Sequence, residues 1–236
     1  MSDEIVEKIY SILIKKRYNR DDPSMTDNLQ QRLTDFVGDN KPIKLIGFWG
    51  VGPKQHKNWA DDASCRFLNE LNQEIKKIYA PGIEFKFIFA INHGIHNGYS
   101  PTVFLTYVKD VIRLFDKYSF KYIYLNDLWQ EYDINFEKIN QLWKKQPKGW
   151  WNNIKNRELI EKNASNRNIH LDPITGAQKY FIMRSLEKKI LEKEFPDSIF
   201  HSFSDSRLRN VLPDLPTLYF YAREGWSDVP WFVVGE

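Results

Sequence analysis

The sequence contains a single cysteine, Cys65, among its 236 residues. One thiol excludes a disulfide bond within the chain and a zinc site built from several cysteines, and it is typical of a protein of the reducing cytoplasm. No run of about eighteen apolar residues is present, which argues against a membrane-spanning helix. We therefore expect a cytoplasmic protein without a membrane partner.

Several short catalytic motifs are also absent. The sequence has no GxxxxGK[ST] loop, no GxGxxG turn before a helix and no GxSxG nucleophile elbow. Its first residues include acids and lack the uninterrupted apolar region of a signal peptide. The formal net charge of +3 is too small to indicate a nucleic-acid partner by itself.

Segments with strand and helix patterns alternate through the first half of the chain. Apolar runs at 43–50, 83–91 and 120–128 are typical of buried strands, and the segments between them, 60–79 and 102–119, have helical periodicity. Right-handed crossovers between such strands predict a parallel sheet. The sequence therefore predicts an α/β fold, a single Rossmann-like domain with a mostly parallel sheet flanked by helices.

The remaining segments extend this domain, which we expect to span 1–236. Residues 1–40 predict an N-terminal helical extension, and 129–170 predict a polar helical insertion. The other predicted elements are a helix at 174–194, strands at 198–204 and 217–222, and an edge strand at 230–234 that begins with a proline.

Ligands bind open parallel sheets beyond the carboxyl ends of the strands, so the loops that follow the predicted strands matter most. The first loop contains glycines together with Lys54, His56 and Lys57. Glycines let a backbone approach an anion and lysines supply positive charge, so this loop is a candidate phosphate or carboxylate site. A surface loop without a ligand is the alternative.

The loop after the second strand, NHGIHNGYS, carries two histidines three residues apart, His93 and His96. A His-x-x-His pair can bind a metal, but such a site needs a third ligand that the sequence does not supply, so we expect no metal. A general acid or base, or a hydrogen-bond donor to a ligand, is the favoured role. Asn92 and Asn97 would then form the turn, and a plain turn is the alternative.

Further candidates lie near the other strand ends. Asp127 follows the third predicted strand, where a carboxylate can act as an acid or base. His201 lies in a later strand, close to Arg207 and Arg209. The two arginines in SRLR can hold a phosphate between them, or they can pair with nearby acids.

Two long stretches resemble a known enzyme family. The run GPKQHKNWADDASCRFLNELNQEIKKIYAPGIEFKFIFAINHGIHNGY combines a lysine-containing loop, an acid, a long helix and a Pro-Gly segment before a strand. The ending, MRSLEKKILEKEFPDSIFHSFSD through VPWFVV, combines an arginine helix, a strand with His and Ser, and a Pro-Trp segment. In this order, over roughly 43–110 and 175–234, these features resemble the isocyanide (isonitrile) synthase family of the pyoverdine and dityrosine biosynthesis type.

The resemblance implies a Rossmann-like fold and a reaction. Such enzymes convert the α-amino group of an amino acid, such as tyrosine or tryptophan, into an isonitrile, with the carbon taken from the sugar phosphate ribulose 5-phosphate and without a metal. By the same resemblance, Lys54 or Lys57 and the pair Arg207 and Arg209 would hold phosphate or carboxylate. No cofactor is expected.

Two alternatives remain open. The chain is also similar to cyclodipeptide synthases, Rossmann-like proteins that use aminoacyl-tRNA. Their nucleophilic serine follows the first strand in a Gly-x-Ser setting, where this chain reads GFWG, which argues against the same covalent mechanism. The other alternative is a non-catalytic module that binds a small molecule.

The predicted site thus has two groups of residues. The predicted catalytic residues are His93, His96, Lys54 and Asp127, and the predicted substrate contacts are His56, Lys57, Asn92, Asn97, His201, Arg207 and Arg209.

Overall fold

The computed structural model describes residues 2–20, 28–147, 157, 172–203, 213–226 and 228–234. Within this part of the chain the strands form one five-stranded sheet in the order β3-β2-β1-β4-β5, and every neighbouring pair is parallel. The predicted α/β, Rossmann-like fold is therefore confirmed. The strands are β1 (Ile43–Gly50), β2 (Ile83–Ala90), β3 (Lys121–Tyr124), β4 (Ile199–Ser202) and β5 (Thr217–Tyr219).

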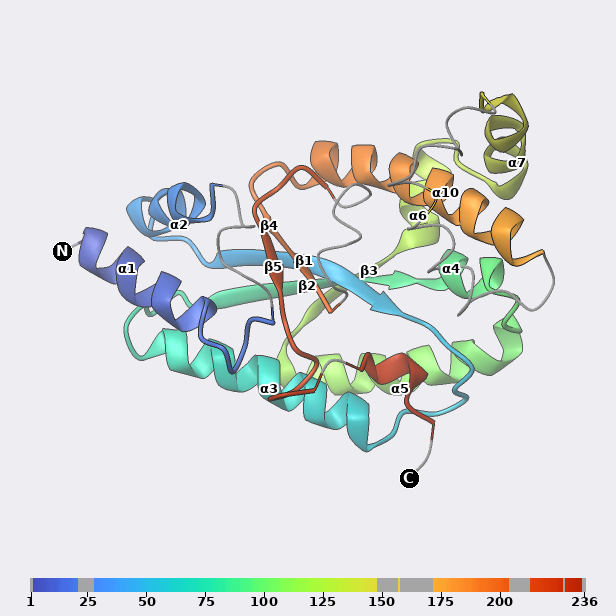
Figure 1. Ribbon diagram of the computed structural model, residues 1–236. Helices are drawn as coiled ribbons and strands as arrows, with labels where there is room; N and C mark the ends of the chain where they lie inside the picture. Colours follow the sequence, from blue (N-terminus) through green and yellow to red (C-terminus); the bar gives the residue numbers. More distant parts are fainter. Residues whose placement is uncertain are drawn as a thin grey trace.

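Helices cover both faces of the sheet (Figure 1). One face packs against α1 (Ser2–Leu13), α2 (Leu29–Gly38), α3 (Trp59–Lys76) and α5 (Pro101–Tyr118). The other packs against α6 (Leu125–Glu131), α7 (Phe136–Lys145) and α10 (Pro173–Glu194). The short helix α4 (Ile91–His96) follows β2, and the 3-10 turn η3 (Pro230–Phe232) lies near the C-terminus. No helix in the described ranges is both long and apolar enough to cross a bilayer.

Alternating strand residues divide the core into two layers. Leu45, Phe85 and Phe87 belong to the layer beneath α3 and α5, whereas Ile46 and Ile88 belong to the layer beneath α10. Because both faces are covered, the strands are apolar throughout rather than alternately polar, which is why the sequence shows them as continuous runs.

Local signals define where two of the long crossover helices, α3 and α10, begin. Asn58 and Asp61 form a capping box at the start of α3. At the start of α10 the side chain of Asp172 accepts a hydrogen bond from the backbone of Thr175, and Pro173 occupies the first helical position. Both helices start within a residue of where the sequence predicts them.

Three predicted elements have a different structure. The loop predicted after the second strand begins as helix α4. The third strand ends at Tyr124 rather than at 128, because α6 begins at Leu125 and buries its apolar side chains. The edge strand predicted at 230–234 is the turn η3 instead. In the last two cases the reason is that a short apolar run does not distinguish a strand from a buried helical turn, and tertiary packing decided between them.

The order of the strands reverses at β1. The chain passes from β1 to β2 and β3 on one side, and returns through α10 to β4, which pairs with β1 on the other side. In open α/β sheets, ligands bind in the crevice beyond the carboxyl ends of the strands at such a reversal. The fold therefore points to the crevice between β1 and β4.

We expect Gly47→Ala to lower the free energy of unfolding by about 2 kcal/mol or more. Gly47 pairs with His201 across β1 and β4, and a Cβ at this position would lie 2.5 Å from the carbonyl oxygen of His201 and 2.6 Å from its Nε2. Gly38→Ala is the control, because nothing lies within 4 Å of a Cβ added there. Urea denaturation measures both variants, and equal effects would contradict the prediction.

Candidate ligand site at the carboxyl edge

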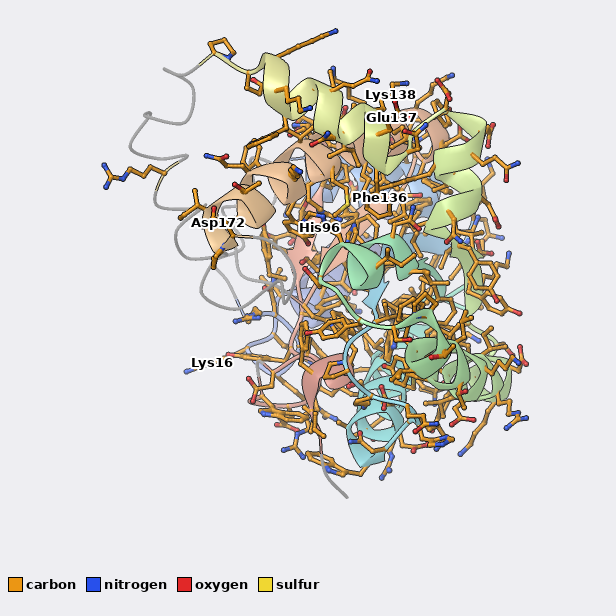
Figure 2. All side chains as sticks on the ribbon, turned by 90° about the vertical axis from the view of Figure 1, so that its right-hand side faces the viewer. Lys16, His96, Phe136, Glu137, Lys138 and Asp172 are labelled. Carbon is orange, nitrogen blue, oxygen red and sulfur yellow. The ribbon has the colours of Figure 1, made fainter. Side chains whose placement is uncertain are left out.

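A cavity of about 70 Å³ lies at the carboxyl edge of the sheet. Its lining comes from the ends of β1, β2 and β4, from α4 and α10, and from η3. Figure 2 views this side of the molecule, where His96 of α4 lies beside Phe136 of α7, with ring centroids 6.5 Å apart. The volume is well below the roughly 300–1,000 Å³ of pockets that enclose a drug-sized ligand. The cavity is thus sized for one small polar end of a ligand.

Helix α4 directs both of its histidines toward α10. Residues three apart in a helix lie on the same face. Nε2 of His93 lies 2.9 Å from each carboxylate oxygen of Glu187, and Nε2 of His96 lies 2.9 Å from the carbonyl oxygen of Gly176. The two histidines therefore bond to different partners, and the described residues contain no cluster of three His, Cys, Asp or Glu side chains suited to a metal ion.

Glu187 is a buried carboxyl group that lies behind the cavity wall and bonds to the residues around it. Its side chain is 0% exposed. Besides His93, it accepts hydrogen bonds from Nη1 of Arg184, at 3.1 Å, and from Nε1 of Trp129, at 3.2 Å. Such donors offset the cost of burying a carboxylate. Two contacts of 2.9 Å from one ring nitrogen to one carboxylate hold the His93 ring in a fixed orientation against α10.

Arg184 brings positive charge to the cavity wall. Its guanidinium carbon lies 4.2 Å from the ring centroid of Phe48, which also lines the cavity. Among the described residues its hydrogen bonds and ion pairs go only to Glu187. A guanidinium has five N–H donors in a planar fork that matches a carboxylate or phosphate, so Arg184 can also bind an anionic group in the cavity.

Lys54, a predicted catalytic residue, lies in a second buried network and not among the residues that line the cavity. Its Nζ donates to Oδ1 of Asn58 at 2.9 Å, to Oδ2 of Asp61 at 2.5 Å and to the carbonyl oxygen of Pro230 at 2.9 Å. These bonds use all three donors of an ammonium group. Burial lowers the pKa of Lys54, and the nearby Asp61 carboxylate opposes that shift.

Three other predicted residues also lie outside the cavity lining. His56 is exposed and its Nδ1 lies 3.0 Å from Asp110, and Lys57 pairs with Asp62 at 2.6 Å. Asp127 is exposed in the first turn of α6. The structure therefore does not bring these three side chains together with His93.

The remaining predicted contacts have mixed positions. Asn92 is buried within α4, and Asn97, just beyond this helix, lines the cavity. Arg207 and Arg209 lie outside the described residues. His201 is among the lining residues, but its side chain is completely buried.

The ring of His201 lies in an aromatic cage on the α3 and α5 side of the sheet. Its centroid is 5.2 Å from Phe87, 5.7 Å from Phe203 and 6.0 Å from Phe220. Neither ring nitrogen has a hydrogen-bond partner among the described residues. Burial lowers the pKa of His201 to about 3, so the ring is neutral at physiological pH.

The sequence prediction missed Arg184, Glu187 and Trp231, which shape the site. A usable signal was present for Glu187. It occupies the buried stripe of α10 together with Met183, Ile190 and Leu191, at positions where a helix normally carries apolar residues. A carboxylate on an apolar stripe needs buried donors, and that marks it as a candidate site residue.

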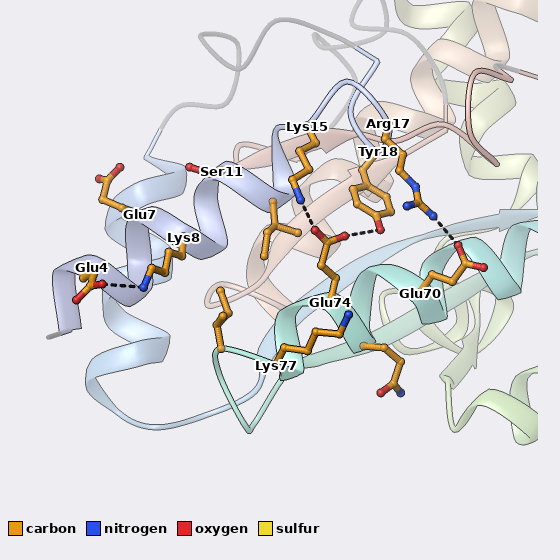
Figure 3. Close-up of a pocket in the computed structure, with 13 residues that line it drawn as sticks. Glu4, Glu7, Lys8, Ser11, Lys15, Arg17, Tyr18, Glu70, Glu74 and Lys77 are labelled. Atoms are coloured by element: carbon orange, nitrogen blue, oxygen red, sulfur yellow. Dashed lines mark hydrogen bonds and ion pairs between the residues drawn. The ribbon is translucent and has the colours of Figure 1, made fainter.

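A larger groove, of about 750 Å³, lies between α1 and α3 (Figure 3). Several of its charged side chains pair with one another, among them Glu74 with Lys15, and Glu70 with Arg17 at 2.7 Å. The groove lies along the C-terminal half of α3, which is at the amino edge of the sheet because a crossover helix runs antiparallel to the strands. It therefore lies away from the edge where such sheets bind ligands.

Fold and cavity together define a Rossmann-like α/β protein with a small cavity at the reversal point of its sheet. No protein-family model and no curated protein matches the sequence. Among solved structures, the chain is similar to the PvcA protein from Pseudomonas aeruginosa, with 15% identity and a TM-score of 0.69 over 96% of this chain and 88% of that one. At this level of identity the likeness shows a common fold, and it agrees with the Rossmann-like fold that the resemblance in the sequence implied.

The chain is also similar to tyrosyl-tRNA synthetase from Leishmania major in complex with tyrosinol, in two crystal forms. The identities are 10% and 11% and the TM-scores 0.51 and 0.53, over 91% and 92% of this chain. The match covers 31% of the synthetase chain in each case, so it concerns the common α/β fold.

We expect His201→Leu to raise the free energy of unfolding at pH 7 by about 1–3 kcal/mol, because leucine fills a similar volume without two unbonded nitrogens. The wild type should also lose stability on acidification. Its unfolded state binds a proton below the ordinary histidine pKa of about 6.5, whereas the folded state does so only near pH 3.

Between pH 6.5 and pH 4.5 this difference amounts to about 2–3 kcal/mol of stability that the leucine variant should not lose. Urea denaturation of both proteins at the two pH values measures it. A variant that is less stable than the wild type at both pH values would show that the ring nitrogens make favourable bonds in solution.

Proposed function

We propose that this protein is a biosynthetic enzyme of the isocyanide-synthase type, which converts the α-amino group of an amino acid into an isonitrile with a carbon taken from ribulose 5-phosphate. The observation that carries the proposal is the pairing of His93 with Glu187 beside Arg184 at the crevice between β1 and β4. The likeness to PvcA over 96% of the chain supports the same reading.

The cavity suits the α-carbon end of an amino acid. Arg184 offers donors for the carboxylate. The aromatic rings of Phe48 and Phe200, whose centroids are 5.9 Å apart, form an apolar wall of the same cavity. A volume of about 70 Å³ accommodates the amino and carboxylate groups rather than a whole aromatic side chain. The tyrosyl-tRNA synthetase structures that share this fold hold tyrosinol, an amino-acid analogue, which is consistent with such a ligand.

His93 is the proposed general base. An α-ammonium group must lose a proton before its nitrogen can attack the carbonyl carbon of a sugar phosphate, and a positioned histidine performs such transfers. Glu187 orients the His93 ring, as a carboxylate does in many catalytic pairs. His96, one helical turn further, bonds to the backbone of α10, and we propose that it helps to hold α4 against that helix.

The test is incubation with L-tyrosine or L-tryptophan and ribulose 5-phosphate, followed by mass spectrometry for the isonitrile. We expect product from the wild type. His93→Gln should lower kcat by about 10²- to 10⁴-fold, as expected for loss of a general base. Arg184→Gln should mainly raise KM for the amino acid, because it removes the charge proposed to bind the carboxylate.

Lys121→Met is the control, since Lys121 pairs with Glu84 at the amino edge of the sheet and should not affect turnover. Absence of isonitrile with every amino acid tested would overturn the proposed reaction. Consumption of aminoacyl-tRNA by the same preparation would then favour the tRNA-dependent alternative, and tight binding of an amino acid without turnover would favour a binding module.

A further inference from the structure

The C-terminal segment forms one wall of the cavity. Trp231 and Phe232 are lining residues. The indole of Trp231 lies against the backbone of Gly50, where a Cβ would be 2.3 Å from the ring, and its centroid is 5.9 Å from that of Trp49. The carbonyl oxygen of Trp231 lies against the backbone of Gly52, where an added Cβ would be 2.2 Å from it. The sequence predicted that the glycines of the first loop leave room for an anion. In the structure, Gly50 and Gly52 leave room for the C-terminal segment instead.

Two polar side chains hold the segment on either side of Trp231. The ammonium of Lys54 donates to the carbonyl oxygen of Pro230, and Nδ2 of Asn58 donates to the carbonyl oxygen of Val233, both at 2.9 Å. Lys54 also donates to Asn58 itself. We call these three bonds the C-terminal clasp.

Asp61 in turn holds the two side chains of the clasp in place. Asp61 is 0% exposed and accepts hydrogen bonds from Lys54, from the backbone of Asn58 and from the hydroxyl of Tyr107, at 2.5, 2.9 and 2.7 Å. That hydroxyl in turn accepts from Nε1 of Trp49 in β1, at 3.0 Å. A continuous chain of buried bonds therefore connects the sheet, α5 and the start of α3 to the segment that carries Trp231.

We propose that Lys54 is a positioning residue, which holds Trp231 in the cavity wall through the C-terminal clasp and does not itself contact the substrate. This inference rests on the proposed function in so far as the cavity is the substrate site. It assigns a specific task to the buried Lys54–Asp61 pair, whose partners are all protein groups. A shift of about 1 Å in a wall of a catalytic site can cost about 100-fold in rate.

The first test is hydrogen exchange, which needs no substrate. Lys54→Met combined with Asp61→Asn removes the pair without leaving either charge buried alone. Asn58→Asp is a second variant, which keeps a helix-capping oxygen and replaces the donor to Val233 by a carboxylate oxygen that cannot donate. We expect the peptide that covers 229–234 to exchange at least about tenfold faster in both variants, while peptides from the central strands are unchanged.

The matched control is Lys57→Met combined with Asp62→Asn. This ion pair lies in the same loop and helix turn, at 2.6 Å, and makes no described bond to the C-terminal segment. Exchange of the 229–234 peptide should be unchanged in this control. Unchanged exchange in the clasp variants as well would overturn the inference, whatever the protein's activity.

The second test separates positioning from direct contact. Trp231→Ala, the Lys54 and Asp61 double variant, and the combination of all three changes are compared by KM for L-tyrosine, or by its Kd from calorimetry. If Lys54 acts through Trp231, each variant should raise the KM or Kd for tyrosine by about tenfold or more. The combination should then bind tyrosine no more weakly than Trp231→Ala alone.

If the losses of tyrosine affinity instead add up in the combined variant, Lys54 contacts the substrate, and the positioning role is wrong. Faster exchange without any change in tyrosine binding would also overturn it. If even the wild type neither binds nor converts any amino acid tested, the proposed function has failed, and the exchange result alone then decides whether the clasp holds the segment.

Discussion

Parallel pairing of β1 with β2 on one side and with β4 on the other is the constraint on which the rest of the structure depends. It places the ends of three strands at one edge, although Gly50, Ala90 and Ser202 are far apart in the chain. Because the strand order reverses at β1, neighbouring loops diverge there and leave a crevice. The residues of the proposed site lie at these three strand ends or on the helices and turns that pack against them.

Two buried carboxylates secure the elements around that crevice. Glu187 accepts bonds from α4, α6 and α10 on one face of the sheet, and Asp61 accepts bonds from the first loop and from α5 on the other. A buried carboxylate is tolerated only where several donors converge on it, so each network admits few arrangements of its helices. The same bonds that offset the burial of charge therefore position His93, Arg184 and the C-terminal segment.

Much of the fold could be predicted because its long elements are periodic. The apolar runs at 43–50 and 83–91 and the helix at 174–194 are close to the observed bounds. Short segments were predicted less well, since a few apolar residues after β3 or Pro230 pack equally well as a turn or as a strand. The candidate site was predicted in part. His93 and Asn97 line the cavity, whereas His56 and Asp127 are exposed, Lys57 is half-buried, and none of these three lines the cavity.

The sequence by itself determined the type and order of the main elements, and thereby the edge of the sheet at which the histidines had to lie. Only the tertiary structure decided what each side chain does there. His93 meets Glu187, 94 residues further along, and Lys54 meets a carbonyl 176 residues away. Periodicity and capping act over a few residues, whereas such partners are chosen by the packing of whole helices on the sheet.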